Sequence, residues 1–95
     1  MERTIIATCK DIIDTGDLES LKDYYASLQN TIFEFGIPWE YIYQQVYLHA
    51  CLKKQIEIVS WLQTIYERFG MIEKIALRQM FSYGNYLLNK KNESN

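Results

Sequence analysis

The sequence predicts an all-α fold of stacked antiparallel helical hairpins, with five to six helices in one domain. Apolar residues recur at helical spacing along most of the 95 residues. Pro38 is the single proline, and proline is the residue that a helix interior tolerates least. The four glycines fall between the apolar segments, where they can end helices. A plain helical bundle is the alternative architecture.

The first predicted hairpin covers residues 2–28. Its first helix, residues 2–14, has an apolar face made of Ile5, Ile6, Cys9, Ile12 and Ile13. Gly16 can take the left-handed conformation that ends a helix, and Thr15 or Asp17 can cap the next one. The second helix then carries apolar residues at helical spacing, namely Leu18, Leu21, Tyr24, Tyr25 and Leu28.

Residues 30–37 are the least regular stretch. Apolar and polar residues alternate between Thr31 and Phe35, so we expect a short extended piece or a compact loop. Pro38 follows at a natural first position for a helix, where its missing N–H is not needed. The third helix, residues 39–53, is apolar nearly all round. It must therefore be covered on more than one side, and we predict that it is the centre of the fold.

The fourth helix, residues 56–68, is amphipathic and should end before Gly70. A fifth helix, residues 72–82, is expected to bury Ile75, Ala76 and Met80. We predict that Gly84 and Asn85 break it and that a last short helix begins at residue 86. The domain then spans residues 1–91, and residues 92–95 form a disordered polar tail.

Composition and motifs argue against an enzyme. His49 is the single histidine, and Cys9 and Cys51 lie far apart without a CxxC motif. A zinc site needs about four ligands. No glycine-rich phosphate loop is present, and carboxylate pairs on the first two helices are typical of solvated faces. We therefore expect no catalytic, cofactor or metal site, and we interpret the cysteines as reduced, buried thiols of an intracellular, cytoplasmic protein. No stretch approaches the roughly 20 apolar residues of a membrane span.

An internal repeat relates the two clearest hairpins. Under an offset of 38 residues, residues 12–21 align with residues 50–59, which pairs Leu18 with Ile56 and Leu21 with Val59. A third copy would place Gly84 where Gly16 lies in the first. Each copy would be an inner helix, a tight turn and an outer helix.

The best copy resembles a known repeat. Residues 50–62, Ala-Cys-Leu-Lys-Lys-Gln-Ile-Glu-Ile-Val-Ser-Trp-Leu, are similar to the turn and second helix of the ankyrin family, A-x-x-x-G-[HND]-x-E-[IV]-V-x-x-L, with Lys54 in place of the glycine. The resemblance implies stacked helical hairpins and a protein-binding role. The Thr-Pro-Leu-His opening of the ankyrin repeat is absent, so loops are expected in place of its β-hairpin fingers. Degenerate, aromatic-rich repeats of this kind resemble those of large DNA viruses, which implies a viral protein that acts on host factors in the cytoplasm or nucleus.

The aromatic residues carry the functional prediction. Fourteen of the 95 residues are Phe, Trp or Tyr, more large rings than a core of this size needs. Tyrosine and tryptophan are favoured anchors at protein interfaces. We predict a non-enzymatic protein–protein interaction module whose candidate anchors are Trp39, Tyr43, Tyr47 and Trp61.

Two further expectations concern partners. The net charge of −2 disfavours nucleic-acid binding, and a nuclear or nucleic-acid-associated accessory protein that uses Lys53, Lys54, Lys90 and Lys91 is the alternative function. The third unit looks truncated, which would leave an open apolar end on the stack. Because repeat arrays need polar caps, we expect a second copy to cover this end in a symmetric homodimer.

Overall fold

The computed structural model describes residues 2–28 and 37–90, so the predicted polar tail and most of the predicted 30–37 loop lie outside the described residues. The described chain forms five helices and no strand: α1 (Glu2–Thr15), α2 (Leu18–Leu28), α3 (Trp39–Leu52), α4 (Ile56–Arg68) and α5 (Lys74–Asn89). The prediction of an all-α fold is confirmed.

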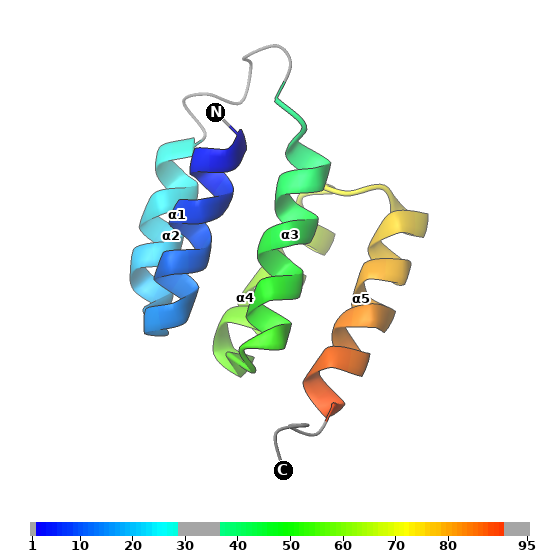
Figure 1. Ribbon diagram of the computed structural model, residues 1–95. Coiled ribbons are helices and arrows are strands. Elements are labelled where there is room, and N and C mark those ends of the chain that lie inside the picture. Colours follow the sequence, from blue (N-terminus) through cyan, green and yellow to red (C-terminus); the bar gives the residue numbers. More distant parts are fainter. Residues whose placement is uncertain (1, 29–36, 91–95) are drawn as a thin grey trace.

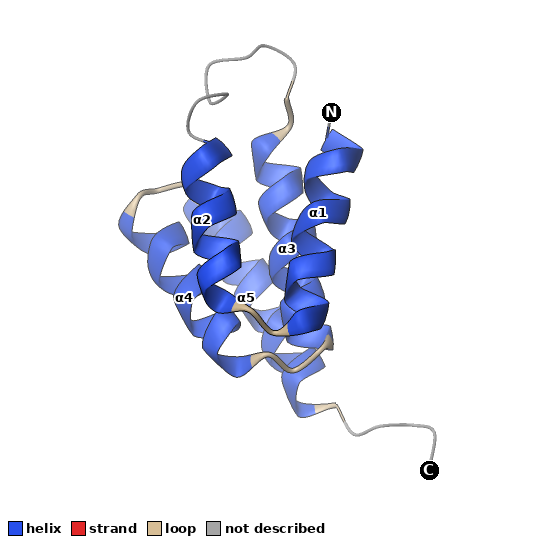
Figure 2. Cartoon of the chain, turned by 90° about the vertical axis from the view of Figure 1, so that its left-hand side faces the viewer, coloured by secondary structure: helices blue, strands red, loops and turns tan. Residues whose placement is uncertain are grey.

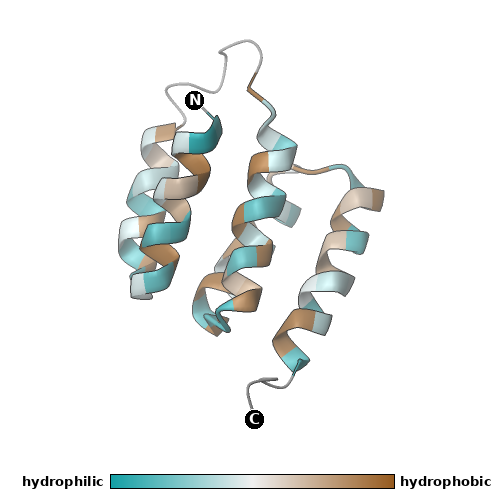
Figure 3. Ribbon diagram, viewed as in Figure 1, coloured by the Kyte–Doolittle hydropathy of each residue, from teal (hydrophilic) through white to brown (hydrophobic). Residues whose placement is uncertain are grey.

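The helices form two layers. In Figure 1, α1, α3 and α5 lie side by side in one layer, and α2 and α4 lie behind them. The turned view of Figure 2 separates α2 and α4 from α1 and α3 in the same way. In Figure 3, hydrophobic and hydrophilic residues alternate along α1 and α3, as expected of helices that have both buried and exposed residues.

α3 is the centre of the fold, as its sequence predicts. It contacts α1 on one side, α5 on the other and α4 in the second layer. Six of its side chains are buried: Ile42, Tyr43, Val46, Tyr47, Ala50 and Cys51. The central position explains why α3 is apolar on several faces, whereas the flanking helices α1 and α5 each bury three residues.

The turns of the two hairpins share one backbone conformation. Gly16 has φ +72° and Lys54 has φ +56°, so both residues are in the left-handed region. The Gly16 N–H donates to the carbonyl of Ile13 at 2.9 Å, and the Lys54 N–H donates to that of Cys51 at 3.0 Å. Both donors and both acceptors are related by the predicted offset of 38 residues. The internal repeat therefore holds at these turns, and Lys54 occupies a site that suits glycine better.

The prediction of a break at Gly84 and Asn85 is wrong, because α5 runs without interruption from Lys74 to Asn89. Gly84 is buried in this helix, and a Cβ atom at its position would lie 2.6 Å from Cε2 of Tyr47 and 2.9 Å from Sγ of Cys51. The glycine therefore permits a close approach of α5 to α3. The described chain consequently has no sixth helix and no turn that would complete a third copy of the repeat.

The prediction that Ile75 is buried is also wrong, because its side chain is 67% exposed. The buried face of α5 is formed by Met80, Gly84 and Leu87, and Ala76 is half-buried beside it. These positions follow helical spacing on the side of α5 that faces α3. Ile75 lies on the opposite side of the same helix.

The turn between α3 and α4 makes hydrogen bonds to the C-terminal ends of α1 and α5. The side-chain amide of Gln55 donates to the carbonyl of Ile13 at 3.1 Å, near the C-terminus of α1. The ammonium group of Lys54 donates to the carbonyls of Leu87 at 2.8 Å and Lys90 at 2.9 Å, at the C-terminus of α5. A cation is favourable at a helix C-terminus, where carbonyl groups lack helical partners.

Candidate functional site

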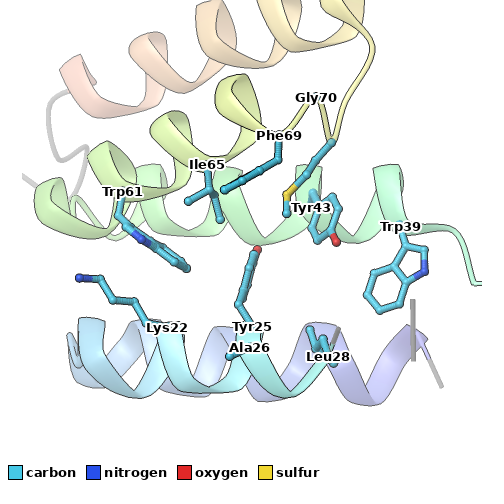
Figure 4. A pocket seen from close by; sticks show the side chains of 11 residues that line it. Lys22, Tyr25, Ala26, Leu28, Trp39, Tyr43, Trp61, Ile65, Phe69 and Gly70 are labelled. Carbon is cyan, nitrogen blue, oxygen red and sulfur yellow. The ribbon is translucent and has the colours of Figure 1, made fainter. Parts of the chain in front are cut away.

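A groove of about 810 Å³ lies between α2 and α4, the two helices of the second layer. Tyr25 and Leu28 of α2 form part of one wall, and Trp61 and Ile65 of α4 form part of the other. Tyr43 of α3 lies between the walls, and Figure 4 shows these side chains converging on the same space. The volume is within the range of about 300–1,000 Å³ that ligand-binding clefts commonly have.

The groove brings together three of the four predicted anchors. Trp39, Tyr43 and Trp61 all line it, although Trp39 and Tyr43 come from the start of α3 and Trp61 from α4. The two tryptophans are half-buried, so each combines a fixed position with some accessible surface. Tyr43 is buried and contributes to the floor of the groove.

Tyr47, the fourth predicted anchor, is a core residue and is not available to a partner in this conformation. Its side chain has 0% exposed surface, and its ring lies 5.3 Å from that of Phe81. Its hydroxyl accepts a hydrogen bond from the side-chain amide of Gln63 at 2.8 Å. Tyr47 also packs against Gly84, so its role is to fill the space between α3 and α5.

Ring contacts hold the groove in shape. The Tyr43 ring stacks on Trp39 with centroids 5.8 Å apart, and it lies 5.9 Å from Tyr25 and 5.3 Å from Tyr66. Trp61 meets the Tyr25 ring edge-on at 5.3 Å. Such pairs contribute about 0.5–1.5 kcal/mol each beyond the burial of area. The walls are therefore preformed rather than loose.

A buried hydrogen-bond chain lies beneath the floor. The Tyr66 hydroxyl donates to the carbonyl of Tyr43 at 3.2 Å, so the Tyr25 hydroxyl is the donor in its 2.6 Å bond to Tyr66. Burial raises the pKa of both Tyr25 and Tyr66 well above the ordinary tyrosine value. Both hydroxyls consequently stay protonated near neutral pH. The two hydrogen bonds fix the Tyr25 ring in the groove.

The polar groups of the groove are few. Lys22 is the one charged residue among the described residues that line it, and its ammonium lies 3.4 Å from the carboxylate of Glu19. The indole nitrogen of Trp39 is buried without a hydrogen-bond partner. A site with one cation and mostly aromatic or aliphatic walls is suited to binding an apolar surface. It offers no pair of groups for proton transfer.

Phe69 also lines the groove, although it is not among the anchors predicted from the sequence. It follows the last residue of α4, it is 65% exposed, and the guanidinium carbon of Arg68 lies 5.9 Å from its ring centroid. The helical pattern alone places Phe69 on the buried face of α4. The sequence already predicts that the helix ends before Gly70, and Gly70 has φ +59° in the structure, so the helical pattern does not extend to the Phe69 ring.

Two of the residues considered for other functions, Lys54 and His49, make contacts between helices. Lys54 is occupied by the carbonyl groups at the end of α5, Lys53 and Lys90 are exposed, and Lys91 lies outside the described residues. Nε2 of His49 lies 2.8 Å from Oδ1 of Asp14, which joins α3 to α1. These contacts account for Lys54 and His49 without a ligand.

The cysteines are free and buried, as expected from the sequence. Burial raises the pKa of the Cys9 thiol to about 12, so this thiol is unreactive near neutral pH. Within residues 2–28 and 37–90, no cluster of histidine, cysteine and carboxylate side chains could hold a metal ion.

Comparison with known proteins adds no relative to these observations. No protein family, curated protein or solved structure matches the chain. The ankyrin resemblance therefore stays a prediction that rests on residues 50–62. None of the described helices is both long and apolar enough to cross a membrane.

Proposed function

We propose that this chain is a non-enzymatic protein-interaction module and that the groove between α2 and α4 is its binding site. The observation that carries the proposal is the convergence of Trp39, Tyr43 and Trp61 on one preformed groove. Aromatic anchors in a fixed, largely apolar cleft bind with little loss of side-chain entropy. The partner's apolar side chains would displace water from the cleft, and its polar groups would remain at the rim.

The proposal includes an intracellular setting. The resemblance to degenerate ankyrin repeats of large DNA viruses supports a viral protein that binds a host protein in the cytoplasm or nucleus. The net charge of −2 and the use of Lys54 as a helix cap support a protein partner over a nucleic acid.

The test selects binding peptides from a displayed random library and measures their affinity for the wild-type protein and for two variants. Phe69→Ala removes an exposed ring from the groove, so it should leave the core intact and weaken binding by about 1–4 kcal/mol. Tyr41→Ala is the matched control, because Tyr41 is 49% exposed and does not line the groove. Selected peptides that bind Phe69→Ala as tightly as wild type would rule out the groove as the site.

Self-association as a homodimer is a second proposal, favoured by the free face of α5. Ile75, Tyr83 and Tyr86 are more than half exposed, and the rings of the two tyrosines stack at 5.9 Å. A second copy could cover this face by pairing α5 with its equivalent across a two-fold axis.

Light scattering coupled to size exclusion, at two concentrations, tests the dimer. The proposal expects twice the monomer mass of 11.3 kDa at the higher concentration and the monomer mass for a Tyr83→Ser/Tyr86→Ser variant. Wild-type protein that remains a monomer at both concentrations would refute it.

A further inference from the structure

We infer that the groove binds an amphipathic helix of about three turns, with an acidic side chain at the end next to Lys22. This inference rests on the proposed function and specifies its partner. Three properties of the groove support it: the length of its walls, the chemistry of the backbone that forms them, and the position of its single charge.

The wall on the α4 side is about two turns of helix long, so a bound helix of about three turns covers it with roughly half a turn beyond each end. Trp61 and Ile65 of α4 and Phe69, which directly follows its last residue, line one wall at intervals of four residues. Eight residues of α-helix rise about 12 Å. Apolar side chains at positions i, i+4 and i+7 of a partner helix span about 10.5 Å. Three such side chains can therefore enter the groove in one row and pack against the ridge on α4.

The walls of the groove favour a helix over an extended strand. A strand that docks on a protein takes much of its affinity from hydrogen bonds to an exposed backbone edge. Here Tyr25 lies inside α2, and Trp61 and Ile65 lie inside α4, where the N–H and C=O groups are already paired along the helix. Leu28 and Phe69 lie at the C-terminal ends of these helices, so most of each wall, though not its whole length, is regular helix. A docked strand would leave its own backbone groups unpaired against these walls, whereas a helix satisfies them internally.

The charge of the groove gives the bound helix a direction. Lys22 lies at the Trp61 end of the groove, opposite the end formed by Leu28 and Trp39 (Figure 4). Its present partner, Glu19, is 3.4 Å away, and the side chains are 40% and 80% exposed. An exposed pair of this kind is weak, so a carboxylate from the partner can replace or share it.

The test uses synthetic helical peptides of about 16 residues, a length at which an alanine-rich chain can be helical. The first peptide carries leucines at i, i+4 and i+7 and a glutamate one turn beyond one end of this row. The second has lysine in place of that glutamate. The third has the composition of the first in an order that destroys the apolar row. Trp39 and Trp61 are the only tryptophans in the chain and both line the groove, so the change in their emission reports binding directly.

The glutamate peptide should bind about threefold to tenfold more tightly than the lysine peptide at low salt, and the third peptide should bind most weakly. Lys22→Gln should abolish the preference for glutamate and Lys22→Glu should reverse it. Lys53→Glu, which makes the same charge change at an exposed residue outside the groove, should leave the preference unaltered.

Equal affinity for the glutamate and lysine peptides would show that the partner needs no acidic side chain next to Lys22. A preference for glutamate that survives both Lys22 variants would show the same. If the third peptide, which lacks the apolar row, binds as tightly as the first, the partner is not an amphipathic helix. If none of the peptides binds, the whole inference fails. The proposed function is judged separately by the effect of Phe69→Ala on library-selected peptides.

Discussion

Replacing Gly84 with alanine should destabilise the protein, although the same change stabilises most helices. In a helix interior, alanine is favoured over glycine by about 1 kcal/mol. Gly84 lies inside α5, so this gain applies. The added Cβ, however, would lie 2.6 Å from a ring carbon of Tyr47 and 2.9 Å from the sulfur of Cys51. Both neighbours are fully buried and cannot move aside without disturbing the core.

The two effects can be compared in size. Inserting an extra methyl group into a well-packed core commonly costs about 1–3 kcal/mol, and a contact this short belongs at the upper end of that range. After subtracting the helix gain of about 1 kcal/mol, Gly84→Ala should lower the free energy of unfolding by about 2 kcal/mol. For a domain of this size, that loss corresponds to a fall in Tm of roughly 8–16 °C.

Urea unfolding followed by circular dichroism at 222 nm measures the difference, with Asn85→Ala as the matched control. Asn85 is exposed and is the next residue of the same helix, so its replacement brings a helix gain without a clash. A Gly84→Ala protein as stable as wild type would refute the close packing of α5 on α3. A loss of stability in Asn85→Ala would instead favour the turn that the sequence had suggested at this place.

Three further predictions concern buried or capping groups. Tyr66→Phe should destabilise the protein by about 1–3 kcal/mol in urea unfolding, more than Tyr25→Phe, because it leaves both the Tyr43 carbonyl and the Tyr25 hydroxyl without their partner. Lys54→Ala should lower the free energy of unfolding by about 1–2 kcal/mol, because the carbonyls at the end of α5 lose their cap. Lys54→Gly should lower it less, because glycine adopts the positive φ without strain; equal losses in the two variants would contradict this reasoning. Burial raises the pKa of Cys9 from 9.0 to about 12, so the contribution of its protonated thiol to stability is present below pH 9 and is lost as the pH rises from 9 towards 12. The free energy of unfolding, measured at pH 7, 9 and 10.5, should therefore fall with pH, and it should fall less steeply for Cys9→Ala.

The hairpins were predictable from the sequence because their signals are local. The apolar faces of α1, α2 and α4 follow from residue spacing, and Gly16 marks a turn by its conformational freedom. The second turn was predictable from the apolar patterns of residues 39–53 and 56–68, but its left-handed residue was not, since Lys54 is not a residue that favours positive φ. The offset of 38 residues pairs Lys54 with Gly16, and this pairing indicates a left-handed conformation that a lysine by itself does not.

The course of α5 was not predictable because it depends on tertiary contacts. A glycine in a helical pattern can end a helix or allow a close approach, and one sequence does not distinguish these roles. The contact of Gly84 with Tyr47 decides between them, and these residues are far apart in the chain. The same contact explains why Tyr47 belongs to the core, whereas Trp61, which looked equivalent as an anchor, lines the groove.

The turn at Lys54 and Gln55 links α1 and α5, the two outer helices of the layer that α3 divides. In a simple stack of repeats, a terminal unit can detach while its neighbours stay folded. Here adjacent residues of one turn hold the last carbonyls of α1 and α5, so any local opening of this turn releases both helix ends together. In hydrogen exchange, the C-terminal turns of α1 and α5 would behave as one cooperative unit, although they lie near opposite ends of the sequence.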